Sequence, residues 1–527
     1  MTVRGAAAVG AGLDPARTAR RITAGERIHV VGAAGAGASA AALLAAWAGA
    51  VVTACDPGGA SQYTPALDAT GIAVEPQHDA SHVTAAPRPD RLAVTKALTA
   101  VAPDHPELVA ARAAGIPVEP WQQVVADAAS GRTLVAVAGT HGKSTTSGWL
   151  VHALVHAGED PGAFVGALLP ASDTGTGTPA TARRGAGPAF VVEADEYAGN
   201  FDAYRPAVTI LTSAEWDHPD VFADRAAVLD VFEAWIRRAS PDADGAAPVL
   251  VANIADDGVA ELVERLRDWP GALIATAIAD VEPQRAGGYA RGIAERFATG
   301  AGPARSLLGR IVAAEPAATV LEITGLDPVA GPRRVRLPTA GRHNAANALG
   351  VAGAALALGI ASGAIAGGLE TFPGVGRRLE RKGEAGGVLV YDDYGHHPTA
   401  IRETLAAVRQ RAPGRRTWAV YEPLTYHRTA ALLGDFAEAL AAADGVAVAD
   451  IWAGRDPDTT VASAAGLAAA VVARNPAIPC AAPGSVEDTA AWLAREVRPG
   501  DVVLVMGGGR SYRIGELLLA ALEDAHR

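Results

Sequence analysis

The chain has 527 residues, which is enough for three or four domains of ordinary size. Half of the residues are hydrophobic and 19% are charged, so the composition excludes a disordered or collagen-like protein. The net charge of -12 argues against nucleic acid or anionic lipid as a partner bound through bulk charge, because both carry negative charge themselves.

The cysteine content and the two uncharged segments indicate the cellular compartment of the protein. Cys55 and Cys480 are too few for a disulfide framework or a four-thiolate metal site, and neither has a histidine nearby in sequence. Residues 28–55 and 345–369 carry no Asp, Glu, Lys or Arg, but their Ala and Gly content favours buried elements over membrane spans. Since the N-terminal segment makes a poor secretory signal, we expect a cytoplasmic protein without membrane insertion.

The first segment predicts a strand, a glycine-rich turn, a helix and a second strand. The strands cover residues 28–31 and 51–54, and the helix covers residues 39–48. Such a turn lets a pyrophosphate approach a helix N-terminus, and an acidic residue about 20 positions further on can meet a ribose hydroxyl. A close-packed corner without a ligand explains the pattern equally well. The candidate ligand-binding residues are Gly32, Gly35, Gly37, Ser39 and Asp56.

The second segment opens with a phosphate-binding loop in its proper context. A strand over residues 134–138 leads into the sequence GTHGKSTT, and a helix follows to His156. Backbone N–H groups of such a loop hold phosphates, the lysine supplies charge, and the hydroxyl that follows it can bind Mg²⁺. Val137 stands where the longer form of the motif has glycine, so this is a short variant. The candidate nucleotide ligands are Gly139, Thr140, His141, Gly142, Lys143, Ser144 and Thr145.

Two later strands of this segment lead to metal-binding side chains. The strand over residues 190–193 ends in the sequence EADE, and the strand over 208–211 leads to Asp217 and His218. Ligands collect at strand ends in open α/β sheets, and carboxylate oxygens suit Mg²⁺. The candidate metal ligands at these positions are Ser144, the carboxylates of Glu193, Asp195 and Glu196, and His218. We expect residues 171–187 to form an exposed loop and residues 280–313 to form an insertion.

The third segment repeats the pattern of strands that end in polar loops. It begins with the sequence GRHNAAN, in which Asn344 and Asn347 share one helical face. These amides either read an adenine edge or cap the helix. Strands over residues 388–391, 418–421 and 502–506 run into YDDYGHHPT, EPLTYHRT and GGG, which is typical of a doubly wound sheet.

The sequences GTHGKSTT, EADE, GRHNAAN, GVGRRLE and YDDYGHHPT together resemble the Mur ligase family, which forms amide bonds in peptidoglycan synthesis at the expense of ATP. The resemblance covers almost the entire chain and implies an α/β fold of three domains. These are an N-terminal Rossmann-like domain that binds a UDP-sugar, a central P-loop ATPase domain and a C-terminal Rossmann-like domain, over residues 1–131, 132–340 and 341–527.

The resemblance also implies partners and roles for individual residues. The cofactors are ATP and Mg²⁺, and the protein is a monomer or homodimer. The Gly32 turn and the sequences PLTYHRT and DIW are most similar to members that join L-alanine to UDP-N-acetylmuramate. The catalytic residues are Lys143, Glu193, His218, Arg378, His396 and Arg428. His343, Asn344 and Asn347 meet the adenine, Asp393 meets the ribose and Arg378 the terminal phosphate. Tyr394, His396 and Arg428 face the muramoyl carboxylate and the amino acid.

The implied reaction is attack of the lactyl carboxylate on the γ-phosphate, followed by attack of the amine on the acyl phosphate. Lys143, Arg378 and Mg²⁺ neutralise the transferring group. His396 acts either as the general base for the amine or as a positioning residue. The chain has no lysine between Lys143 and Lys382, so the carbamylated lysine of several family members has no counterpart here.

Two alternatives stay open. Relatives that add L-alanine often have Ser-Asp at positions 55–56, Gln at 422, His at 424 and Glu-Ser-Asp at 196–198. This chain has Cys-Asp, Glu, Leu and Glu-Tyr-Ala at these positions. Glu196 followed by Tyr197 resembles instead the murein-recycling ligase, which attaches a tripeptide to the same sugar nucleotide. A paralogue that binds a nucleotide without ligating is the second alternative.

Overall fold

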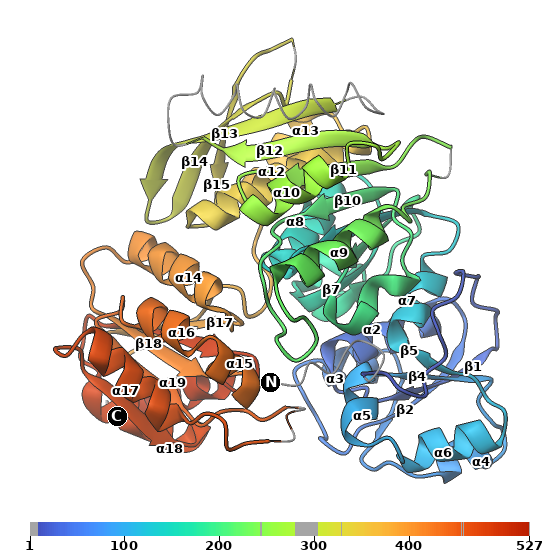
Figure 1. Ribbon diagram of the computed structural model, residues 1–527, viewed down its shortest axis with the longest axis horizontal. Helices are drawn as coiled ribbons and strands as arrows, with labels where there is room; N and C mark the ends of the chain where they lie inside the picture. The colour runs from blue at the N-terminus through green and yellow to red at the C-terminus, as the bar shows by residue number, and fades with distance from the viewer. Residues whose placement is uncertain are drawn as a thin grey trace.

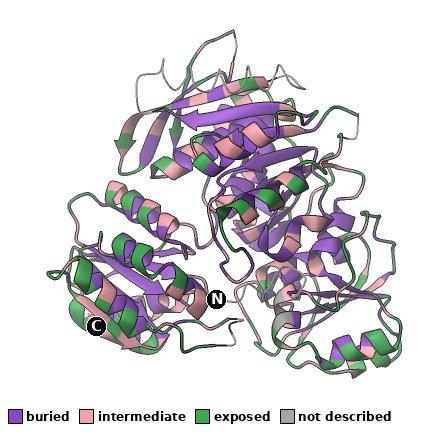
Figure 2. Cartoon of the chain, viewed as in Figure 1, coloured by how far each residue is buried: buried purple, intermediate pink, exposed green. Residues whose placement is uncertain are grey.

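The computed structural model describes residues 9–242, 245–279, 304–327, 329–454, 456 and 458–525. These residues form three units, each built on its own sheet (Figure 1). The sheets have five, ten and six strands in chain order, and helices cover them. In Figure 2 the central strands of the sheets are largely buried, whereas many exposed residues lie on the outer helices. The α/β fold of three units expected from the sequence is therefore confirmed.

The N-terminal sheet is parallel throughout, in the order β3-β2-β1-β4-β5. Its strands are β1 (Arg27–Val31), β2 (Val51–Cys55), β3 (Val74–Glu75), β4 (Arg91–Val94) and β5 (Val118–Pro120). Its helices are α2 (Ala36–Trp47), α3 (Thr64–Ala69), α4 (Ser81–Thr84), α5 (Lys96–Val101), α6 (Pro106–Ala113) and α7 (Trp121–Ala128). The predicted strand, turn, helix and strand are present, although the helix begins three residues earlier than expected.

The central sheet has the order β15-β14-β13-β12-β11-β10-β6-β9-β7-β8. Its strands are β6 (Thr133–Ala138), β7 (Gly162–Leu169), β8 (Ala180–Arg183), β9 (Ala189–Glu193), β10 (Val208–Leu211), β11 (Val249–Asn253), β12 (Ala272–Ile278), β13 (Ala304–Glu315), β14 (Ala318–Thr324) and β15 (Arg333–Leu337). Helices α8 (Lys143–His156), α9 (Arg225–Ile236) and α10 (Asp257–Arg265) flank it, with 3₁₀ turns η1 (Ala171–Asp173) and η2 (Tyr197–Ala203). The parallel core of this sheet brings the ends of β6, β9 and β10 to one edge.

Two segments of the central unit, residues 171–187 and 280–313, contain strands that the sequence did not predict. The exposed loop predicted over residues 171–187 is correct only in part. Residues 175–177 are exposed, but β8 lies within the range, is buried and pairs antiparallel with β7. Alternating Ala and Thr gave no recognisable strand pattern there, and helix α2 of the N-terminal unit covers the strand. Of the predicted insertion over 280–313, residues 304–313 belong to β13, and residues 280–303 lie outside the described part of the chain.

Two helices that follow the central sheet in sequence also pack on it. Helices α12 (Arg342–Ala357) and α13 (Ser362–Glu370) share one apolar core with β6, β7, β10 and α8. A Cβ atom at Gly353 would lie 2.6 Å from Val251 Cγ1, so α12 approaches the sheet closely. We propose that the third domain begins after Val375, rather than at residue 341 where the sequence placed it.

The third unit has the strand order β16-β17-β21-β18-β19-β20, with β16 antiparallel to its neighbour. Its strands are β16 (Glu380–Ala385), β17 (Val388–Asp393), β18 (Thr417–Glu422), β19 (Gly445–Ala449), β20 (Cys480–Gly484) and β21 (Val502–Gly507). Its helices are α14 (Pro398–Arg411), α15 (Tyr426–Ala431), α16 (Leu433–Leu440), α17 (Ala464–Arg474), α18 (Val486–Glu496) and α19 (Tyr512–Ala525). Separate apolar cores on the two faces make it doubly wound. Within the described residues, no helix has both the length and the apolar character that crossing a membrane requires.

Candidate active site

A single cleft of about 1390 Å³ is lined by residues of all three units. The phosphate-binding loop forms part of its wall, together with the ends of β9, β17 and the loop before α15. The three lysines of the chain, Lys96, Lys143 and Lys382, all line this cleft. In a protein that otherwise uses arginine for positive charge, this distribution marks the cleft as the chemically specialised part of the molecule.

Two glycines give the phosphate-binding loop its shape. Gly139 has φ 129°, and a Cβ atom there would lie 2.3 Å from Thr212 Oγ1. Gly142 has φ 77° and precedes α8, and a Cβ atom there would lie 2.6 Å from Asn347 Oδ1. Glycine tolerates both the positive φ and the close approach, so the N-terminus of α8 opens directly into the cleft.

Lys143 is surrounded by carboxylates. Its Nζ donates to Gly139 O at 2.6 Å and to Glu196 Oε2 at 3.1 Å, and lies 3.8 Å from Asp195 Oδ1. Burial by itself lowers the pKa of Lys143, but Glu196, Asp195 and Glu193 raise it above the usual range. Burial raises the pKa of Glu196 to about 7, although Lys143 opposes this shift. Lys143 is therefore charged at neutral pH and lies among more carboxylates than it can neutralise.

Ser144 connects the central and third units. Its Oγ donates to Glu193 Oε1 at 2.9 Å, and the other carboxylate oxygen accepts a hydrogen bond of 2.6 Å from Gly166 N. Arg378 Nη2 donates to Ser144 Oγ at 2.6 Å from the far side of the cleft. The Arg378 guanidinium also lies over the Tyr394 ring, 4.8 Å from its centroid. An arginine of one unit thus meets the phosphate-binding loop of another.

His218 and Arg428 meet at the same end of the cleft. Arg428 Nη2 donates to His218 Nδ1 at 3.0 Å and to Asp217 Oδ1 at 2.9 Å. Arg428 and Asp217 are both buried, and although burial raises the pKa of Asp217, Arg428 holds it well below its usual range. His218 Nε2 lies 3.9 Å from Glu196 Oε1, and ligand atoms of Asp195, Glu196 and His218 form a group that could hold a metal ion.

The predicted adenine and ribose residues are engaged in local hydrogen bonds. Asn344 Nδ2 donates to Ala340 O at 2.8 Å, and Asn347 Nδ2 donates to Asn344 Oδ1 at 3.3 Å. Asn344 is therefore not an N-cap, because an N-cap side chain accepts from the first helical turn. His343 Nδ1 lies 3.3 Å from Glu403 Oε2 on α14. Asp393 accepts hydrogen bonds of 2.7 Å from Leu379 N and Gly395 N, which fixes the backbone after Arg378.

His396 lies inside the cleft with Tyr394. Its Nδ1 is 2.9 Å from the backbone oxygen of Tyr394. Burial, reinforced by the positive charge of Arg428, holds the pKa of His396 well below its usual range. The imidazole is therefore neutral near pH 7, which is the protonation state that a general base requires.

The structure brings only part of the predicted sugar-nucleotide turn to the cleft. Gly37 lines the cleft, and a Cβ atom there would lie 2.2 Å from the Trp121 ring. Ser39 is fully buried, with its hydroxyl 3.1 Å from Thr181 Oγ1 on β8. Asp56 Oδ2 accepts from Ala34 N at 3.0 Å and so holds the turn that contains Gly32 and Gly35. Gly32, Gly35, Ser39 and Asp56 are not among the residues that line the cleft.

The sequence singled out His141 as a nucleotide ligand but not its partners Glu215, His397 and Thr399, with which it joins the central and third units. Glu215 Oε2 lies 3.5 Å from His141 Nε2 and 3.9 Å from His397 Nδ1, and it accepts from Thr399 Oγ1 at 2.8 Å. Burial raises the pKa of Glu215, but His141 and the hydroxyl of Thr399 lower it to about 2 overall. Glu215 follows β10, and His397 and Thr399 follow β17. The predicted site residues also follow strands, so this position is the signal that could have identified these three residues.

Three family models match successive parts of the chain. They are the catalytic domain of the Mur ligase family over residues 27–133, the Mur ligase middle domain over 137–355 and the glutamate ligase domain of Mur ligases over 377–509. The chain belongs to the Mur ligase family. The three expected units of this family correspond to the three sheets described above.

Relatives and solved structures agree with this assignment. A UDP-N-acetylmuramate–L-alanine ligase of Mycobacterium sp. (strain JLS) is 37% identical over 94% of this chain and 95% of its own length. The crystal structure of a UDP-N-acetylmuramate-alanine ligase from Thermotoga maritima has a TM-score of 0.71 at 22% identity, covering 95% of this chain and 99% of that one. A murein peptide ligase from Psychrobacter arcticus has a TM-score of 0.67 at 24% identity and covers the same shares.

Proposed function

We propose that this Mur ligase joins L-alanine to the lactyl carboxylate of UDP-N-acetylmuramate, with ATP as the energy source and an acyl phosphate as the intermediate. The observation that carries the reaction type is the meeting of Lys143, Ser144 and Arg378 in one cleft. The choice of L-alanine is supported by mycobacterial relatives of that activity, which are 37% identical over 94% of the chain.

The cleft fits the transfer of a phosphoryl group. Backbone N–H groups after Gly142 and the Lys143 ammonium would hold the phosphates of ATP, and Arg378 would reach the terminal phosphate from the third unit. Because the attacking carboxylate and the phosphate are both anionic, these cations lower the repulsion as the new P–O bond forms and the bond to ADP breaks.

A divalent cation fits the donor set. Ser144 Oγ and Glu193 Oε1 are already 2.9 Å apart, and His218 lies in the neighbouring group with Asp195 and Glu196. Oxygen donors of this kind suit Mg²⁺, so we assign it to Ser144, Glu193 and His218. When bound, it would supply positive charge to the phosphate oxygens. The excess of carboxylates over lysine at this point is consistent with that assignment.

The second step needs a deprotonated amine near the acyl phosphate. His396 Nδ1 lies 2.9 Å from the backbone oxygen of Tyr394, so in the neutral ring Nδ1 carries the proton and Nε2 has the lone pair that would accept the proton the amine loses. Arg428, held by Asp217, lies beside His396 and would orient the carboxylate of the amino acid. The amine then attacks the acyl carbon, phosphate leaves, and the amide bond is formed.

The runner-up function is ligation of a tripeptide to the same sugar nucleotide. It is favoured by the sequence Glu196-Tyr197 and by the similarity of the fold to the murein peptide ligase of P. arcticus. Tyr197 Oη donates to Asp220 at 3.0 Å and its ring lies 4.7 Å from that of His218, so this position touches the cleft where the nucleophile would enter.

Phosphate release distinguishes these functions. The enzyme is incubated with ATP, Mg²⁺ and UDP-N-acetylmuramate, and L-alanine, glycine, L-serine and L-Ala-γ-D-Glu-diaminopimelate are compared as nucleophiles. Release that depends on L-alanine and is abolished by Lys143→Ala supports the proposal. A preference for the tripeptide would favour the recycling ligase instead. Nucleotide binding without release for any nucleophile would identify a paralogue that no longer ligates.

A further inference from the structure

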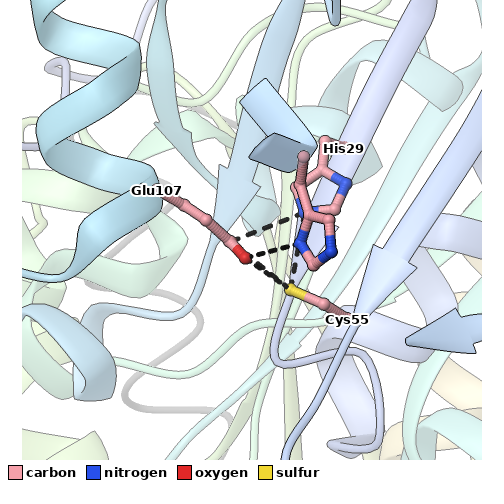
Figure 3. Close-up of side chains that lie close together, drawn as sticks. His29, Cys55 and Glu107 are labelled. Carbon is pink, nitrogen blue, oxygen red and sulfur yellow. Dashed lines mark hydrogen bonds and ion pairs between the residues drawn. The ribbon is translucent and has the colours of Figure 1, made fainter. Parts of the chain in front are cut away.

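A second cluster of metal-binding side chains lies in the N-terminal unit, away from the cleft. His29 on β1, Cys55 at the end of β2, His82 on α4 and Glu107 on α6 place one ligand atom each within 4.8 Å of one another. Figure 3 shows Glu107 projecting from its helix toward His29 and Cys55 on the neighbouring strands. None of the four lines the active-site cleft.

The distances within the cluster approach those of a tetrahedral zinc site. Cys55 Sγ lies 3.4 Å from His29 Nε2 and 3.2 and 3.4 Å from the two carboxylate oxygens of Glu107. His29 Nε2 lies 3.5 Å from Glu107 Oε2. Bonds of about 2.0 Å to nitrogen or oxygen and about 2.3 Å to sulfur place tetrahedral ligands roughly 3.3–3.6 Å apart. His82 Nδ1, at 2.8 Å from Glu107 Oε1, would move outward by less than about 1 Å to reach that spacing.

The cluster also has the charge and the second layer of contacts that a metal site needs. A thiolate and a carboxylate together neutralise a dication, which removes the main cost of burying one. The His29 ring is oriented by a contact of 2.8 Å between its Nδ1 and Thr53 Oγ1, which directs Nε2 at Cys55. His29, Cys55 and Glu107 are at most 1% exposed, so the cluster is shielded from bulk solvent.

Two further histidines face the same cluster. His78 Nδ1 lies 3.2 Å from Cys55 Sγ and 3.7 Å from Glu107 Oε1. His105 is 5% exposed, its ring lies 4.3 Å from that of His78, and neither of its ring nitrogens has a hydrogen-bond partner among the described residues. A ligand atom of His105 lies within 4.8 Å of those of His78 and Glu107. An unpartnered, buried imidazole at this point is unexplained by packing, because burying it without a partner carries a cost.

We propose that His29, Cys55, His82 and Glu107 bind one zinc ion or a similar divalent transition metal, with His78 and His105 next to it. The mixture of sulfur, nitrogen and a single carboxylate selects such metals over Mg²⁺ and Ca²⁺, which prefer oxygen ligands. On binding, the Cys55 thiol releases its proton to solvent and forms the S–metal bond. The metal would fasten the short helices α4 and α6 to strands β1 and β2.

The proposed metal site lies next to the glycine-rich turn that precedes α2. The backbone oxygen of Cys55 accepts hydrogen bonds from Gly32 N at 2.9 Å and Ala33 N at 3.1 Å, within the glycine-rich turn. The neighbouring Asp56 holds the same turn through Ala34 N. Metal binding at Cys55 would therefore stiffen the turn and the helix N-terminus behind it.

Cobalt spectroscopy of the full-length protein tests the proposal. The chain is stripped with a chelator and titrated with Co²⁺ in the absence of nucleotide, and the absorption spectrum is recorded. A tetrahedral site with one thiolate gives a sulfur-to-cobalt charge-transfer band and strong visible absorption, saturating at about one equivalent, and Zn²⁺ abolishes both by displacement. Because the band requires a thiolate, cobalt bound at the carboxylates of the active site does not produce it.

Matched variants show which cysteine is responsible. Cys480 lies in the third unit with its Sγ near Ala468 O, so Cys480→Ser should keep the band, and Cys55→Ser should lose it. His82 is on the margin of the cluster, so His82→Asn should fold and shift both the visible bands and the cobalt affinity. Zinc should raise the melting temperature of the wild type and of Cys480→Ser but not that of Cys55→Ser. Absence of the band in the wild type, or its loss in Cys480→Ser, would overturn the proposal and leave a hydrogen-bonded network without metal.

Discussion

Two clusters of carboxylates in this protein differ in how their charge is balanced. The cluster of the N-terminal unit consists of three carboxylates and three guanidinium groups, namely Glu26, Glu119, Asp127, Arg17, Arg20 and Arg91. Its central residue, Arg91, is 2% exposed and lies 2.6–2.9 Å from all three carboxylates. The cluster of the cleft also has three carboxylates, Glu193, Asp195 and Glu196, but among the described residues Lys143 is the one lysine or arginine that forms an ion pair with any of them.

The difference separates a structural cluster from a binding one. Where every charge has its partner within the fold, nothing remains for a ligand to neutralise, and the contacts fasten the N-terminal segment to the sheet. Where carboxylates are in excess, a buried site has an unfavourable field until a cation enters. We infer that the imbalance around Lys143 favours the entry of a cation into the cleft.

The largest effect is expected from breaking the balanced cluster. Arg91→Leu leaves three buried carboxylates with too little positive charge, so the free energy of unfolding should fall by about 3–5 kcal/mol. Urea-induced unfolding measures this change. Arg267→Leu is the matched control, because the Arg267 side chain is 58% exposed and pairs with Glu264, and such a pair contributes at most about 1 kcal/mol. Equal destabilisation by the two variants would contradict this assignment.

We expect Lys143→Met to change turnover more than stability, whereas Arg91→Leu mainly lowers stability. Loss of the ammonium should lower kcat for phosphate release at least about 100-fold, because charge on the transferring group is no longer neutralised. Stability should change much less than in Arg91→Leu, since Glu196, whose pKa is already raised to about 7, can take up a proton in place of the lost cation. A variant that unfolds as readily as Arg91→Leu while retaining its turnover would refute the comparison.

Arg378 should show the advantage of a guanidinium that reaches across the cleft. We expect Arg378→Ala to lower kcat roughly 10- to 100-fold, and Arg378→Lys to restore part of that loss, because a point charge cannot bond both Ser144 and phosphate in a fork. Steady-state kinetics with saturating ATP measures both. If the lysine variant matched the wild type, positive charge alone would explain the role of Arg378.

A smaller effect is expected from the pH dependence of the balanced cluster. Burial raises the pKa of Glu26, but hydrogen bonds from Arg20 and Thr23 and the charge of Arg91 lower it overall, from 4.5 to about 2. Its stabilising contribution is therefore complete above pH 4.5 and is lost as the pH falls toward 2. Glu26→Gln should flatten this part of the stability profile in urea unfolding. An identical slope in wild type and variant would show that Glu26 is not responsible.

The residues of the cleft could be predicted from the sequence more fully than the packing of the helices around it. Glu193 and Asp393 are the last residues of β9 and β17, and Lys143 and His396 lie in or after the loops that follow β6 and β17. Parallel strands bring such positions to one edge of a sheet. That logic needs only local patterns. It does not reach α12 and α13, because an Ala-rich helix without charges indicates burial but not which sheet buries it.

The two buried clusters around Cys55 and Arg91 could not be predicted from the sequence, for a related reason. Cys55 contacts Glu107, which is 52 residues away, and no spacing rule connects strand β2 to helix α6. Likewise, Arg91 reads as an ordinary strand residue until the fold places Glu119 and Asp127 beside it. Contacts between elements far apart in sequence depend on the packing of the whole unit, which local periodicity does not encode.

The central claim is that the cleft activates a carboxylate by transferring phosphate to it. It is tested most directly by following oxygen-18 from the labelled lactyl carboxylate of UDP-N-acetylmuramate during turnover with ATP and L-alanine. If an acyl phosphate forms, the amine expels phosphate that carries one labelled oxygen, and mass spectrometry of the released phosphate should find it. Unlabelled phosphate, released at the rate of amide formation, would contradict the account.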